Sequence, residues 1–139
     1  MIKLDYTKLS DGGVHILITC KVDGFPLRFV LDTGASHTVL DTEWAKENLS
    51  EKEINRAEDP AQGIGSSVEV HKAIISELII GDFTMNNRSI ALIDFSSINA
   101  VYEREGLEEV QGILGGDILF DYKAIIDYDG MELHFLAIK

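Results

Sequence analysis

The residue with the strongest claim to a chemical role in this sequence is Asp32, an acidic residue at the end of an apolar run. The run alternates in character, and one of its faces carries Phe25, Leu27, Phe29 and Leu31. A period of two predicts a half-buried strand that leads directly into Asp32. Thr33 then supplies a hydroxyl, and Gly34 permits close approach of the backbone. The segment therefore predicts a carboxylate held in a tight turn at the end of a strand.

A second short motif lies much later in the chain. Gln111-Gly112 is followed by the apolar pair Ile113-Leu114 and then by Gly115. Between the two motifs, the cluster Gly63-Ile64-Gly65 predicts a turn.

These segments together resemble the retropepsin-like aspartic peptidases, the single-domain relatives of pepsin that include the retroviral proteases and many bacterial proteins. The resemblance implies that Asp32 is the catalytic aspartate. It implies two residues that lock the active-site loops of two subunits together, Thr33 and Gly34. It implies five residues that contact substrate, the last three within a mobile flap: Ala35, Ser36, Gly63, Ile64 and Gly65. It implies three residues that support the active-site loops: Ile113, Leu114 and Gly115.

The sequence departs from the retroviral members at two places. Gly116 stands where they usually have an arginine, which weakens the transfer of their subunit-bracing ion pair. The separation between the motifs is also longer, and a predicted helix over residues 97–105 accounts for part of it. This insertion is more similar to the bacterial members.

A physical argument extends the resemblance to the assembly. Peptide hydrolysis without a metal or a nucleophilic side chain needs one group to deprotonate water and another to protonate the amide. Two adjacent carboxylates do both, because like charge leaves them one shared proton. The chain has one Asp-Thr-Gly, so the second carboxylate must come from another copy across a two-fold axis. We therefore expect a homodimer that cleaves peptides and an inactive monomer.

Composition limits the other possibilities. The chain has 139 residues, which fits one domain over residues 1–139. Its formal net charge of −12 repels phosphate backbones and anionic lipid, so we expect no nucleic-acid or membrane partner. One cysteine, Cys20, excludes an intrachain disulfide. With no apolar signal segment and no run as long as a membrane span, a cytoplasmic location is the default expectation.

The pattern of elements favours an all-β-dominated fold, which the resemblance identifies as the acid-protease (retropepsin-like) β-barrel with two or three short helices. Strands are expected over residues 14–22 and 25–31, joined by an Asp23-Gly24 turn. Asp41 is expected to cap a short helix, and residues 50–62 to form an exposed connection. Ser96 or Ser97 is expected to cap the helix over 97–105, with Gly106 ending it. The last strand is expected over 133–138.

Several alternatives stay open beside this interpretation. Asp-x-Gly is ordinary turn chemistry, and Gly63-Ile64-Gly65 is equally consistent with a plain hairpin turn. A non-catalytic dimeric peptide-binding module could use the same scaffold. The run from Ile125 to Gly130 resembles the nucleophile strand of haloacid-dehalogenase-type phosphatases, but only nine residues follow it. The histidines are scattered, so we expect no metal and no cofactor: His15, His37, His71 and His134.

Overall fold

A computed structural model describes residues 1–57 and 71–136 of the chain. Its strands are β1 (Ile2–Lys3), β2 (Asp5–Lys8), β3 (Val14–Val22), β4 (Phe25–Leu31), β5 (Val39–Asp41), β6 (His71–Ile80), β7 (Phe83–Ile93), β8 (Gly112–Leu114), β9 (Ile125–Asp127) and β10 (Glu132–His134). Its helices are α1 (Thr42–Asn48), α2 (Glu51–Ala57), α3 (Ser96–Arg104) and α4 (Gly116–Asp121). None of the helices in these ranges is long and apolar enough to cross a membrane.

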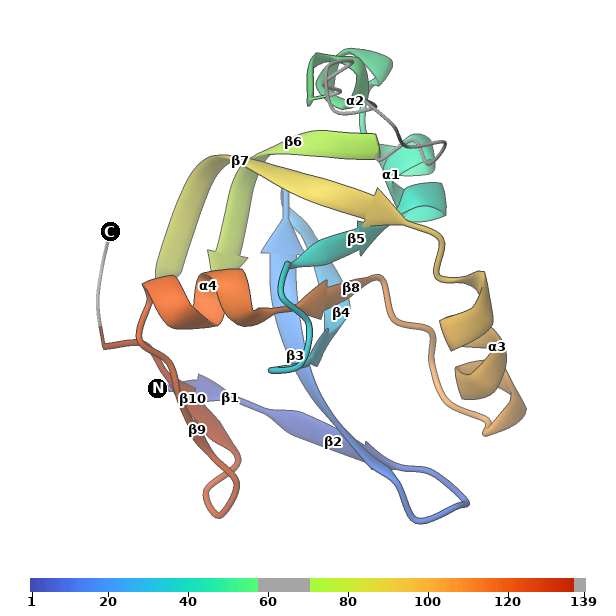
Figure 1. Ribbon diagram of the computed structural model, residues 1–139, viewed down its shortest axis with the longest axis vertical. Coiled ribbons are helices and arrows are strands. Elements are labelled where there is room, and N and C mark those ends of the chain that lie inside the picture. The colour runs from blue at the N-terminus through green and yellow to red at the C-terminus, as the bar shows by residue number, and fades with distance from the viewer. Residues whose placement is uncertain (58–70, 137–139) are drawn as a thin grey trace.

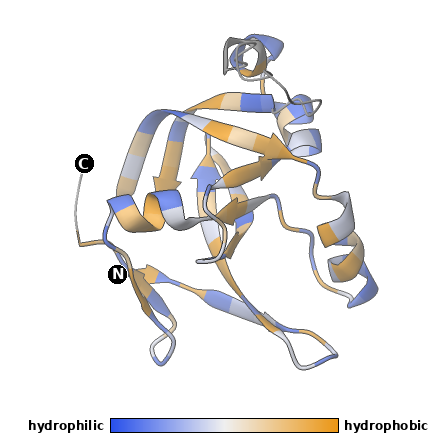
Figure 2. Ribbon diagram, viewed as in Figure 1, coloured by the Kyte–Doolittle hydropathy of each residue, from blue (hydrophilic) through white to orange (hydrophobic). Residues whose placement is uncertain are grey.

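The larger sheet closes on itself as a barrel (Figure 1). Its strand order is β2-β3-β4-β8-β5-β7-β6, and a further pairing of β3 with β6 joins the two ends of the run β3 to β6. Six strands therefore form the barrel, with β2 attached outside it. Figure 2 shows hydrophobic residues concentrated on β5 and β8, the short central strands. This is the mostly β, barrel-type architecture that the sequence predicts.

The β3–β4 hairpin sets the register of the barrel core. Asp23 and Gly24 both have positive φ, 48° and 88°, as a two-residue hairpin turn requires. The side chains of Phe29 and Leu31 enter the main core from β4. Phe29 is fully buried against Gly112 of β8, where an added Cβ would lie 2.3 Å from the phenylalanine Cε2 atom. Gly112 is therefore a packing requirement of the core.

A second, smaller core lies between the barrel and α3. Leu17, Phe95, Tyr102 and Val110 are buried together there. The hydroxyl of Tyr102 forms a hydrogen bond of 2.7 Å with Nδ1 of His15, and the two rings stack. Burial raises the pKa of the Tyr102 hydroxyl. These contacts fix α3 on the outer side of β3, to the right of the barrel in Figure 1.

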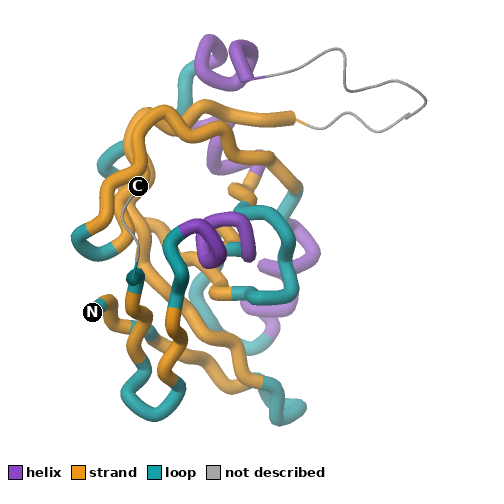
Figure 3. Tube along the Cα trace, turned by 60° about the vertical axis from the view of Figure 1, so that its left-hand side comes forward, coloured by secondary structure: helices purple, strands orange, loops and turns teal. Residues whose placement is uncertain are grey.

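A three-stranded sheet of order β1-β10-β9 lies outside the barrel. Ile2 of β1 pairs with Leu133 of β10, and Leu133 pairs in turn with Ile126 of β9. Figures 1 and 3 place the β9–β10 hairpin below α4, at the end of the molecule opposite α2. Leu133 is fully buried, so this sheet packs against the main core on one side.

Two helix predictions need correction. The described residues contain four helices, where two or three were expected, because residues 51–57 form α2 within the segment predicted as an exposed connection. Ser50 Oγ accepts a hydrogen bond from the backbone N–H of Glu53, a capping interaction that stabilises the first turn. The predicted serine caps of α3 are also wrong. Phe95 occupies the cap position, and Ser96 donates both its N–H and its hydroxyl to Asp94.

The C-terminal strand is shorter than predicted. It covers Glu132–His134 where residues 133–138 were expected, and residues 137–139 lie outside the described residues. The chain after His134 turns away toward α4, where the N–H of Leu136 donates to the carbonyl of Tyr122.

Candidate active site

Asp32 lies in a tight turn directly after β4. Its Oδ1 atom accepts a hydrogen bond of 2.9 Å from the N–H of Gly34, and its carbonyl accepts one from the N–H of Ala35. The carboxylate is exposed in the single chain. The turn therefore fixes one carboxylate oxygen, and the other has no hydrogen-bond partner among residues 1–57 and 71–136.

The β8 strand holds the Asp32 turn from the other side. β8 lies between β4, with which it runs parallel, and β5, with which it runs antiparallel. The N–H of Asp32 donates to the carbonyl of Leu114 at 3.0 Å, which extends the β4–β8 ladder by one bond. Two segments far apart in the sequence thus meet at the carboxylate.

Gly115 and Gly116 pack against the backbone of the same loop. A Cβ on Gly115 would lie 2.7 Å from the carbonyl carbon of His37 and 2.8 Å from the carbonyl oxygen of Ala35. That oxygen accepts a 2.7 Å hydrogen bond from the N–H of Gly116. The space between the two segments is too small for any side chain at position 115.

A carboxylate in α4 connects the far side of the loop to the helix. Oδ1 of Asp117 accepts hydrogen bonds from the N–H of Thr38 at 2.9 Å and from its hydroxyl at 2.7 Å. It also accepts from the N–H of Ile118. The Thr38 hydroxyl in turn accepts from the N–H of Gly115 at 3.0 Å. The hydrogen bonds of Thr38 thus join the end of the Asp32 loop to Gly115 and to Asp117 in α4.

Replacing Asp117 by alanine is expected to destabilise the protein by about 1–3 kcal/mol, because the buried N–H and hydroxyl of Thr38 lose their acceptor. Asp117→Asn keeps an oxygen acceptor at the same position and is the matched control. Urea denaturation of the two variants and the wild type measures the difference. Equal midpoints for all three proteins would contradict a structural role for this link.

An apolar row crosses the strands that lead to the Asp32 loop. Val30, Ile113 and Val39 face one another across β4, β8 and β5, and all three are half-buried against the smaller core. This row therefore packs the strands that carry the loop against the side of the barrel that α3 covers.

Most of the other predicted site residues lie in the same loop. Gly34 and Ser36 are exposed, and Ala35 is half-buried. Within the described residues, no side chain or backbone group bonds the Thr33 hydroxyl, so its locking role between subunits stays a prediction. Gly63, Ile64 and Gly65 lie outside the described residues. Two open depressions elsewhere on the surface, of about 410 and 390 Å³, do not include Asp32.

The sequence-based prediction did not identify Thr38 and Asp117 as parts of the site. The sequence contains only a weak indication of a role for either residue. Thr38 is a polar residue at the entry to the apolar strand β5, and Asp117 is the carboxylate that follows Gly115-Gly116 before two apolar residues. A pairing between positions that are 79 residues apart has no local signature.

Comparisons with known proteins agree with this geometry. The family model described as aspartyl protease matches residues 18–118. A retropepsin-like aspartic protease from Rickettsia conorii has a similar structure, with a TM-score of 0.54 and 17% identity over 91% of this chain and 88% of its own. The retroviral protease-like domain of Ddi1 from Leishmania major gives a TM-score of 0.57 and 15% identity over 88% of each chain. No curated protein matches in sequence.

Proposed function

Since the chain belongs to the aspartyl protease family, we propose that it is an aspartic endopeptidase whose active site forms between two copies of the chain. Asp32 of each subunit supplies one carboxylate, and the pair shares a proton. One carboxylate accepts a proton from the attacking water, and the other donates one to the leaving nitrogen. The observation that carries the proposal is the exposed Asp32 carboxylate, which the N–H of Gly34 orients in a loop that is bonded to Leu114.

The substrate in this proposal is an extended peptide. Backbone groups of Ala35 and Ser36, in the loop that carries Asp32, contact the peptide backbone. The dimer brings two such loops together across its two-fold axis.

A subunit-mixing experiment tests the shared site. The wild-type protein is expected to cleave members of a peptide library. A tenfold excess of the Asp32→Asn protein, allowed to exchange subunits, is expected to lower that cleavage about tenfold, because most wild-type chains then pair with an inactive partner. The same excess of an Asp82→Asn protein is the control, since Asp82 is an exposed turn residue after β6. Cleavage that the excess leaves unchanged would contradict a site shared between subunits.

The alternative is a dimeric peptide-binding module on the same scaffold. It predicts that the wild-type protein binds peptides and leaves every one whole. Mass spectrometry of the library after incubation distinguishes the two functions. The same measurement with a metal chelator tests for a metal-dependent hydrolase, and we expect the chelator to leave cleavage unchanged.

A further inference from the structure

The first half of β7 has an unpaired edge beside an open depression. β7 pairs with β6 along most of its length, but β5 pairs only with its last residues, 91–93. In the described part of the chain no strand pairs with this second edge over residues 84–89. The same residues, together with Tyr122, line the depression of about 410 Å³. This part of β7 therefore presents backbone N–H and C=O groups next to a hollow that a ligand can enter.

Asn87 interrupts the regular alternation of this strand. Its φ is 51°, in the left-handed region where non-glycine residues are uncommon and cluster at functional sites. The register of β6 with β7 omits it. Met85 and Ile90 are both buried although they are five residues apart, an odd separation that a regular strand does not place on one face. Because of this kink, Asn86 and Asn87 are both exposed, where a regular strand would expose one of them.

The polar side chains along this edge have unused hydrogen-bonding groups. Four of them make no side-chain hydrogen bond to residues 1–57 or 71–136: Thr84, Asn86, Asn87 and Ser89. An asparagine amide offers a donor and an acceptor together, which match the C=O and N–H groups of a peptide backbone. Residues 84–89 in a strand span about 17 Å, so their polar groups form an elongated site. Such a site fits an extended peptide better than a compact ion.

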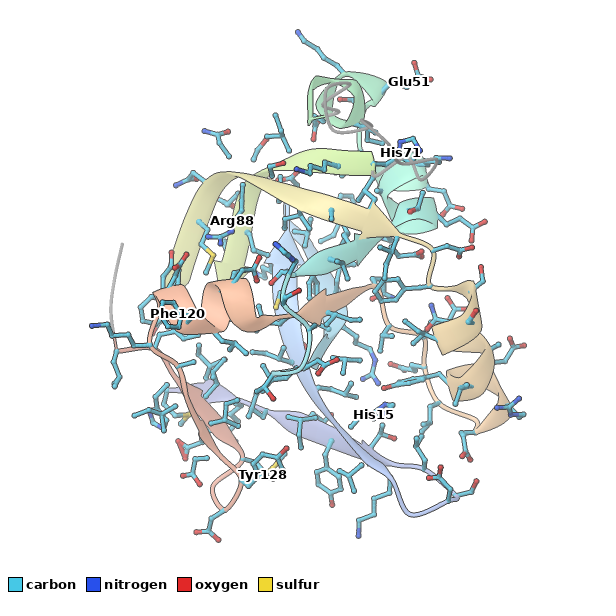
Figure 4. All side chains as sticks on the ribbon, viewed as in Figure 1. His15, Glu51, His71, Arg88, Phe120 and Tyr128 are labelled. Atoms are coloured by element: carbon cyan, nitrogen blue, oxygen red, sulfur yellow. The ribbon has the colours of Figure 1, made fainter. Side chains whose placement is uncertain are left out.

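Arg88 is the one charged residue among the described residues that line the depression. Its two Nη atoms lie 3.9 Å from Oδ2 of Asp121 and 3.9 Å from Sδ of Met85, so in the described part of the chain neither makes a close hydrogen bond to an oxygen. The Arg88 side chain is 25% exposed, so its donors can bind a further carboxylate. Phe120 precedes Asp121 in α4 and is 84% exposed. Figure 4 shows Phe120 at the outer end of α4, on the same side of the molecule as Arg88, so one ligand can reach both.

We propose that the first half of β7 is a docking site for an extended peptide, in which Arg88 binds an acidic side chain of that peptide. The amides of Asn86 and Asn87 and the edge of β7 bind the peptide backbone. Phe120 packs against an apolar side chain next to the acidic one. The peptide is a flexible segment of another protein, and the positive charge of Arg88 selects against a basic segment. This site does not include Asp32, so the inference does not depend on catalysis.

The test titrates two pools of short peptides into the isotope-labelled Asp32→Asn protein, so that no peptide is cleaved during the measurement. One pool has Glu beside Leu at its centre, the other has Gln beside Leu, and the remaining positions are random. The NMR amide signals of residues 84–89 report binding at this site and give a dissociation constant. We expect the Glu pool to shift these signals and to bind about tenfold more tightly than the Gln pool, because a guanidinium binds a carboxylate more strongly than an amide.

Three further substitutions, each added to the Asp32→Asn protein, locate the contacts. Arg88→Gln removes the charge and is expected to weaken binding of the Glu pool about tenfold. Asn87→Gly removes an amide but keeps the kink, because glycine adopts a positive φ without strain, and it is expected to weaken both pools about fivefold. Arg104→Gln is the control, since Arg104 is an exposed residue of α3, on the opposite side of the barrel from α4 in Figure 1. It is expected to leave both dissociation constants unchanged.

Unshifted signals of residues 84–89, or equal dissociation constants for both pools and all variants, would overturn the inference. The same shifts produced by free glutamate at the same concentration would also overturn it, because they would indicate a site for a small anion. Peptide cleavage by the wild type is a separate measurement. An inactive wild type whose β7 edge binds the Glu pool removes the peptidase and keeps the docking site, and an active one whose β7 edge binds neither pool does the reverse.

Discussion

Replacing Asp32 by asparagine is expected to lower kcat/KM for peptide cleavage by about 10³-fold or more, because the dimer then lacks both the carboxylate that activates water and the one that protonates the leaving nitrogen. The side-chain oxygen of asparagine can still accept the hydrogen bond from the N–H of Gly34, so the turn itself is retained. The expected loss is therefore one of chemistry. Cleavage of a fluorogenic peptide, measured beside the unfolding temperature of each protein, gives both quantities.

The matched control for this prediction is Asp82→Asn. It makes the same change of charge at another exposed aspartate in a turn after a strand, and it is expected to keep full activity. If Asp32→Asn cleaved as fast as Asp82→Asn, Asp32 would not be the catalytic carboxylate, and this conclusion would hold for a monomer and for a dimer.

Replacing Gly115 by alanine is expected to lower both the stability and the activity of the protein. Its Cβ would lie within 2.8 Å of backbone atoms of both Ala35 and His37, and backbone cannot move aside as a flexible side chain can. We expect a loss of about 2–3 kcal/mol in the free energy of unfolding, which is typical of overpacking. Displacement of the Asp32 loop is also expected to lower kcat/KM about 100-fold, since a shift of about 1 Å in an active site has that effect.

The neighbouring glycine provides the control. A Cβ on Gly116 would lie 3.3 Å from the carbonyl oxygen of Ala35, a contact that a small adjustment relieves. Because alanine also favours the helix that begins there, Gly116→Ala is expected to change stability by less than about 1 kcal/mol. Equal stability and activity of the two variants, measured by urea denaturation and peptide cleavage, would show that the contact at Gly115 does not constrain the loop.

The elements that the sequence predicted well are those with local signals. The bounds of β3 and β4 follow from alternation and from Asp23-Gly24, and they agree with the structure. The helix after Asp41 was also predicted, since the side chain of that residue accepts from the N–H of Glu43. Such signals depend only on neighbours along the chain, so a single sequence contains them in full.

The elements that were missed depend on weaker or distant signals. α2 has the mostly polar sequence Glu-Lys-Glu-Ile-Asn-Arg-Ala, in which Ile54 packs against the main core, so the sequence lacks the stripe that marks an amphipathic helix. Its one local signal was the spacing of Ser50 and Glu53, which is typical of a capping box.

The residues of the candidate site also fall into those that a local motif indicates and those that no local motif indicates. Asp32 and Leu114 could be singled out because each stands in a short motif. The link between Thr38 and Asp117 could not, because either residue has many polar candidates as partners until the fold brings one of them close. A hydrogen bond between distant segments is a property of the barrel topology, and a single sequence does not encode it in any local pattern.

The bond between Asp32 and Leu114 has a consequence for the life of the newly made chain. Synthesis proceeds from the N-terminus, so the aspartate leaves the ribosome long before the strand that holds it. Contacts between such distant positions form late in folding. The Asp32 loop of the nascent polypeptide therefore lacks its bond to β8 until the segment around Leu114 has emerged.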